Sequence, residues 1–66
     1  MFIKDLLAKI VSSNSKTIAV DIYDNKGLQL INFDLPGYES LSDEVLDAEV
    51  DKLTIVTLNK IRIDLV

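Results

Sequence analysis

Hydrophobic and polar positions alternate with a period of two in four segments of the chain. Alternation of this kind is typical of β-strands that bury one face. The four segments are residues 17–23, 28–35, 53–57 and 61–66. The pattern therefore predicts two β-hairpins, one in each half of the chain.

The first hairpin is connected by Asp-Asn-Lys-Gly at residues 24–27, whose glycine can adopt the positive φ that such turns need. Because a shift of one residue would turn every side chain to the other face, the apolar pattern also predicts the register. Pairing Ile22 with Ile31, and Val20 with Phe33, keeps all four side chains on the core face.

The second hairpin allows two registers. A two-residue loop at 58–59 would place Ile55 opposite Arg62, whereas a three-residue loop at 58–60 places Ile55 opposite Ile63. We favour the longer loop, with Asn59 or Lys60 in the left-handed conformation, because it pairs apolar residues with each other. It also pairs Leu53 with Leu65. The predicted core face of this hairpin is Leu53, Ile55, Ile61, Ile63 and Leu65.

Two helices are predicted around the hairpins. Residues 2–11 carry apolar side chains at helical spacing, which is typical of a helix that covers a sheet. The proline and glycine at 36–37 end the second strand, and residues 40–47 then form a short helix with Ser40 as its N-cap. The apolar stripe of the first helix is Phe2, Ile3, Leu6, Leu7, Ile10 and Val11. We therefore expect one α+β domain over residues 1–66, in the order αββαββ, with a four-stranded antiparallel sheet and the N-terminal helix on one face.

Charge is distributed unevenly along the chain. The protein has a net charge of −4, but residues 34–51 contain seven acids and no base, so this segment carries −7 and the remainder +3 (four acids against seven bases). A field of this kind attracts basic partners and speeds their association. The carboxylates of this acidic segment, our candidate partner-binding residues, are Asp34, Glu39, Asp43, Glu44, Asp47, Glu49 and Asp51. A plainer interpretation is a solvated surface that keeps a small protein soluble.

The residue types that most often carry out catalysis are missing. The sequence has no histidine and no cysteine, so it lacks the usual proton shuttle, thiolate nucleophile and soft metal ligands. No glycine-rich phosphate loop or calcium-binding loop is present either. We expect no enzyme activity, no cofactor and no metal. The acidic balance argues against direct binding to nucleic acid, and the absence of a long apolar run argues against a membrane span. A cytoplasmic location is the default.

Three stretches resemble a group of small uncharacterised proteins carried by phages and prophages of Gram-positive bacteria. They are residues 3–7 (Ile-Lys-Asp-Leu-Leu), residues 24–27, and residues 44–50 together with 59–65. The resemblance covers nearly the whole chain and consists of structural motifs. It implies a mobile-element context, in which small acidic proteins often occupy the surface of a host protein.

Two hypotheses about function follow. The first is a non-catalytic interaction protein whose acidic segment binds a host protein, including an inhibitor of a nucleic-acid-binding protein. The second is a self-associating structural or accessory protein, for example a homodimer, that uses the sheet face away from the helices or an open strand edge. The candidate residues for self-association are Tyr23, Leu30, Val56 and Val66.

Overall fold

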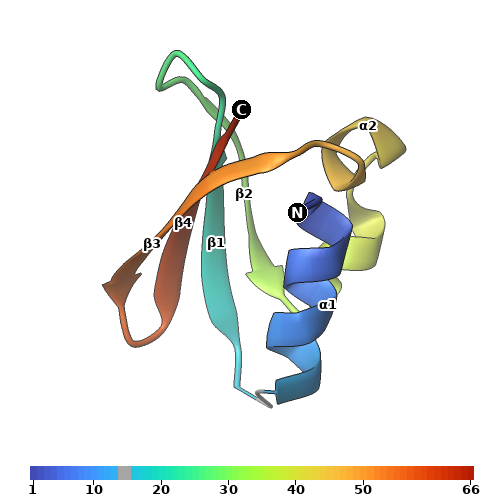
Figure 1. Ribbon diagram of the computed structural model, residues 1–66. Coiled ribbons are helices and arrows are strands. Elements are labelled where there is room, and N and C mark those ends of the chain that lie inside the picture. Colours follow the sequence, from blue (N-terminus) through green and yellow to red (C-terminus); the bar gives the residue numbers. More distant parts are fainter. Residues whose placement is uncertain (14–15) are drawn as a thin grey trace.

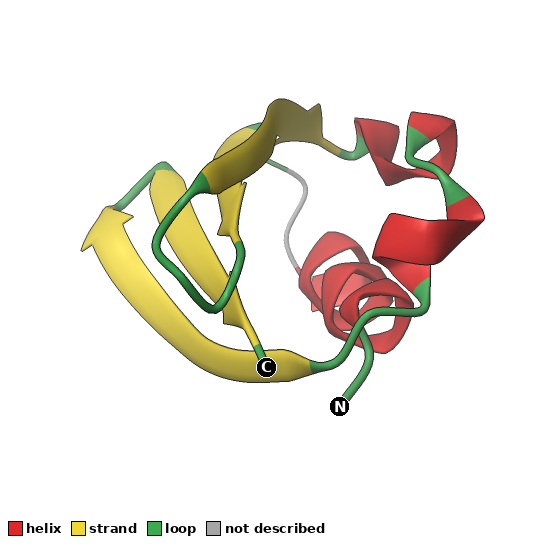
Figure 2. Cartoon of the chain, turned by 90° about the horizontal axis from the view of Figure 1, so that it is seen from above, coloured by secondary structure: helices red, strands yellow, loops and turns green. Residues whose placement is uncertain are grey.

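The computed structural model describes residues 1–13 and 16–66 (Figure 1). Helices gather on one side of a curved four-stranded sheet, as the view from above shows (Figure 2). In chain order the elements are α1 (Ile3–Ser13), β1 (Ile18–Tyr23), β2 (Gln29–Leu35), the 3-10 helix η1 (Gly37–Ser40), α2 (Asp43–Leu46), β3 (Val50–Thr57) and β4 (Lys60–Leu65). The predicted α+β class, with an N-terminal helix against a four-stranded sheet, is confirmed.

The sheet is mixed, and the expectation of a fully antiparallel sheet is corrected on this point. Its strand order is β2-β1-β4-β3, and the central pair, β1 and β4, runs parallel. The strands with the most completely buried alternation take the centre, because central strands are the ones that the helices cover. Ile18, Val20 and Ile22 of β1 are buried, as are Ile61 and Ile63 of β4. The segment holding η1 and α2 carries the chain from one edge of the sheet to the other.

The first hairpin has the predicted register. Val20 pairs with Phe33 and Ile22 with Ile31. Its turn contains Gly27 at a φ of +82°, and the Asp24 carboxylate accepts the backbone N–H groups two and four residues further on, each at 2.9 Å. These two hydrogen bonds hold the pKa of Asp24 below its ordinary value.

The second hairpin has neither register considered above. Thr57 pairs with Lys60 across a two-residue loop, but Ile55 pairs with Ile61 and Leu53 with Ile63. The register shifts between Ile55 and Thr57, where β3 contributes one more residue than β4. A β-bulge of this kind adds one residue to one strand, so a short loop and an apolar pairing occur together. In the described part of the chain no non-glycine residue has a positive φ, so the expected left-handed Asn59 or Lys60 is wrong.

Helix α1 packs on the sheet through Ile3 and Leu7, which are fully buried. Phe2, which was expected in the apolar stripe of this helix, precedes α1, forms a β-bridge with Glu49 and is half exposed. Two further residues belong to the buried core: Leu35, the last residue of β2, and Leu41, which follows η1. None of the described helices is long and apolar enough to cross a membrane.

The predicted core face of the second hairpin is only partly correct. Ile61 and Ile63 are buried and Leu65 is partly buried, but Ile55 is 73% exposed and Leu53 is 42% exposed. These two residues lie on β3, at the edge of the sheet, beyond the strands whose residues form the buried core with α1. Their side chains therefore face the same side as the core without a covering layer.

Candidate functional site

The acidic residues singled out from the sequence are spread over three places. Asp34 lies on β2, beside a hollow of about 340 Å³ on the sheet that Asp21, Asn32 and Lys60 also line. Asp51 lies on β3, at the opposite edge of the sheet. The remaining acids belong to the helical crossover and to the three residues that follow α2, and they are all exposed: Glu39, Asp43, Glu44, Asp47 and Glu49.

The crossover forms a short helix because Ser42 caps it. Its hydroxyl accepts the N–H of Val45 at 3.4 Å, and acidic residues occupy the first turn, where the partial positive charge of the helix end favours them. The predicted cap, Ser40, instead ends the 3-10 helix η1. Ser40 and Ser42 lie two residues apart, and either could serve as the N-cap of the short helix as far as the sequence shows. Val45 and Leu46 pack against the core and hold α2 in place.

One lysine stands among the acids at this end of the molecule. The Nζ atom of Lys4 lies 3.0 Å from Oδ1 of Asp47. That hydrogen bond is the main reason why the pKa of Lys4 is raised, and the charges of Asp5 and Asp43 add to the effect. Acidic residues therefore outnumber the ammonium group of Lys4 in this region, and the excess charge is negative. We call Asp5, Asp43, Glu44 and Asp47 the acidic end.

The sheet face that points away from α1 is charged rather than apolar. The guanidinium of Arg62 lies 3.8 Å from the centroid of the Tyr23 ring. It donates from Nε and Nη2 to the Asp64 carboxylate, at 2.9 Å in the shortest contact, and these bonds raise the pKa of Arg62. Lys60 and Asp21 form a second ion pair, at 3.3 Å. Tyr23 is therefore partly covered by a cation from the neighbouring strand.

The other three residues proposed for self-association lie at different places along the sheet. Leu30 lies at the register shift of β2, on one edge of the sheet, and Val56 at the register shift of β3, on the other edge. Val66 follows the end of β4. All three side chains are exposed.

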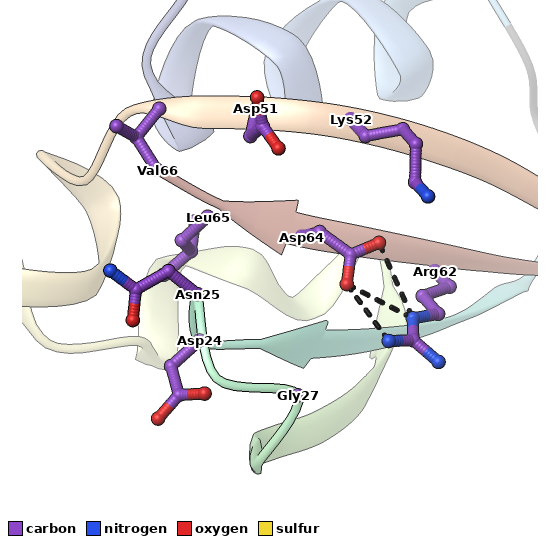
Figure 3. A pocket seen from close by; sticks show the side chains of 9 residues that line it. All are labelled: Asp24, Asn25, Gly27, Asp51, Lys52, Arg62, Asp64, Leu65 and Val66. Carbon is purple, nitrogen blue, oxygen red and sulfur yellow. Dashed lines mark hydrogen bonds and ion pairs between the residues drawn. The ribbon is translucent and has the colours of Figure 1, made fainter.

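A polar hollow of about 450 Å³ opens where the first hairpin's turn approaches the end of β4 (Figure 3). Asp24, Asp51 and Asp64 line it together with Lys52 and Arg62. Figure 3 shows the Asp24 carboxylate turned away from that of Asp64, which already holds Arg62. Among residues 1–13 and 16–66, no three acidic side chains come together in a way that could hold a metal ion.

The exposure of Ile55 and Leu53 on β3 was not recognised from the sequence. Ile55 and Leu53 are joined by Val56, which is 51% exposed, and by Leu58, which is 96% exposed in the loop that follows. Alternation alone indicated burial for the first two, because it reports the face of a strand and not its position in the sheet. The missed signal was the charged pair Asp51-Lys52 at the start of the strand, since charges often mark edge strands.

Comparison with models of known families found no match, and comparisons with curated proteins and with solved structures also found none.

Proposed function

We propose that this chain is a non-catalytic interaction domain that binds a basic protein surface through its acidic end. The observation that carries the proposal is a group of exposed carboxylates near Lys4. Asp43, Glu44 and Asp47 lie on or directly after α2, a helix that packs against the core, and Asp5 lies on α1. A negative and solvated surface on a folded scaffold is suited to attracting a positive groove on another protein.

The partner class that fits this surface is a protein whose basic groove binds nucleic acid. Carboxylates held on a folded scaffold can occupy such a groove in place of phosphates, so an inhibitory role follows from the same contacts. The resemblance to phage and prophage proteins makes a Gram-positive lysate the first source to test.

The test begins with affinity capture from that lysate and identification of the retained protein. The purified partner is then titrated against wild type and against a variant in which Asp43 and Glu44 are both changed to lysine. Asp47 is left unchanged because it is already paired with Lys4. The expected result is a large loss of affinity in the variant, with circular dichroism showing an intact fold.

The matched control changes Asp34 and Asp51 to lysine, which reverses the same number of charges away from the acidic end. It should retain most of the affinity. Binding should also weaken steeply with salt, because the Debye length falls from about 8 Å at 0.15 M to about 3 Å at 1 M ionic strength. Equal losses in the two variants, or binding that salt does not change, would contradict the proposal.

A further inference from the structure

The edge strand β3 has an apolar surface that the rest of the chain leaves uncovered. Ile55 and Leu53 pair with Ile61 and Ile63, so they continue the same side of the sheet that holds the core. The two residues on β4 are 8% and 0% exposed, whereas those on β3 are 73% and 42% exposed. Met1 accepts the N–H of Val50 at the start of this edge, and beyond that point an edge strand presents unpaired backbone donors and acceptors. Both features are satisfied by another strand with the same apolar pattern.

We propose that β3 pairs with β3 of a second copy of this chain, antiparallel, around a two-fold axis that passes beside Thr54. In this register Leu53 lies opposite Ile55 of the second copy, and Ile55 lies opposite its Leu53. The two apolar pairs form one continuous patch on the helix-facing side of an eight-stranded sheet. A two-fold interface repeats each contact, so one favourable pair supplies two.

Neighbouring registers are less favourable. An axis beside Leu53 would place Ile55 opposite Asp51, and an axis beside Ile55 would place Leu53 opposite Thr57. Only the axis at Thr54 sets apolar side chains against apolar side chains at both positions, and cross-strand pairs of this kind stabilise a sheet.

Electrostatics do not oppose contact at this edge. Residues 50–66 carry Lys52, Lys60 and Arg62 against Asp51 and Asp64, a balance of +1, in a protein with a net charge of −4. In Figure 1, α2 lies on the opposite side of the molecule from the β3–β4 turn, so pairing through β3 keeps α2 of each copy away from the contact. The two Lys52 residues would be four strand positions out of register, about 14 Å along the strand, which exceeds the Debye length at physiological salt.

The irregularities of β3 limit the length of the contact. Register shifts between Val50 and Lys52 and between Ile55 and Thr57 leave an uninterrupted run from Lys52 to Ile55. Bulges discourage indefinite edge-to-edge pairing. We therefore infer a closed dimer and not a filament.

The test uses single-cysteine variants, because the chain has no cysteine of its own. In Thr54→Cys the two thiols face each other across the axis, within the range that a disulfide can bridge after small adjustments. In Thr57→Cys, the matched control on the same strand, the thiols are six positions out of register, about 20 Å apart. In a glutathione redox buffer, Thr54→Cys should form a covalent dimer at least about tenfold faster than Thr57→Cys.

Sedimentation equilibrium without cysteines supplies the second measurement. Wild type should approach twice the monomer mass with rising concentration and then level off. Ile55→Lys should raise the midpoint concentration at least about tenfold, whereas Leu30→Lys, a comparable change on the other edge strand, should leave it unchanged. Circular dichroism of Ile55→Lys should show an intact fold, because this side chain is largely exposed.

Three results would overturn the proposal. One is a wild-type mass that stays monomeric at several hundred micromolar. Another is a dimer that Ile55→Lys leaves intact or in which both cysteines react at the same rate, since a different surface would then join the copies. The third is a mass that keeps rising beyond the dimer, which indicates an open assembly.

Discussion

Replacing Ile63 with valine removes one methylene group from a fully buried position between β1 and β3. Such a change costs about 0.5–1.5 kcal/mol in the free energy of unfolding. For a domain of this size each kcal/mol lowers Tm by about 4–8 °C, so we expect Ile63→Val to melt about 4–8 °C below wild type for a loss of about 1 kcal/mol. Ile55, which faces the same side of the sheet, is 73% exposed. With about a quarter of its surface buried, Ile55→Val should cost about 0.3 kcal/mol, or about 1–2 °C.

The assay is thermal denaturation followed by far-ultraviolet circular dichroism at low micromolar concentration, with urea denaturation as a check. The two variants make the same chemical change at strand residues that face the same side of the sheet, one on a central strand and one on the edge strand. Low concentration is needed because a dimer through β3 would bury Ile55 and raise the cost of changing it. Equal decreases in Tm at low concentration would refute our conclusion that the core ends before β3.

Three further predictions follow from single residues. Gly27→Ala should lower the free energy of unfolding by about 1–2 kcal/mol, because an L-residue is strained at positive φ. No atom lies within 4 Å of the added carbon, so backbone strain is the whole cost. Urea denaturation would measure the loss. Asp24→Asn should be less stable than wild type above about pH 5. The stability difference between wild type and Asp24→Asn should disappear as the pH falls below 3.8, the ordinary pKa of an aspartate, and through the lowered pKa of Asp24 in the folded state. The reason is that the carboxylate stabilises the fold only while it is ionised. Thermal melts of both proteins from pH 7 to pH 2 test whether the difference decreases in this direction. Leu7→Ala should cost about 2–5 kcal/mol at a fully buried site, which is comparable with the whole stability of a domain of this length, so its circular dichroism spectrum at 37 °C should show substantial unfolding.

The first hairpin could be predicted from the sequence because all of its signals are local. A turn that contains Gly27 and two alternating strands leave one register in which Val20 and Ile22 keep apolar partners, and the structure has that register. The covering helix could also be predicted, because its apolar stripe is continuous from Ile3 to Val11. Signals of this kind need only neighbouring residues.

The second hairpin and the strand order could not be predicted in the same way. Strand β3 has one extra residue, Val56, at its register shift. Because of it, the hairpin has a two-residue loop together with a register that neither a two-residue nor a three-residue loop would give by simple alternation. No glycine in the sequence marks this bulge. The parallel pairing of β1 with β4 depends on the crossover through η1 and α2, which joins opposite edges of the sheet. For the same reason alternation placed Leu53 and Ile55 in the core, and the candidate interface at β3 became visible only with the complete sheet.

The parallel pair also sets the order in which this protein can fold during synthesis. Ala19 is the neighbour of Lys60, and Tyr23 of Asp64, so the middle of the sheet joins segments about forty positions apart. A chain without β4 has a helix and one hairpin, in which β1 has a neighbouring strand on one side only. Contacts this distant in sequence slow folding, and partly made chains with exposed apolar strands are prone to aggregate. A chain truncated before residue 60 should therefore be bound by chaperones, whereas one that includes β4 should escape them.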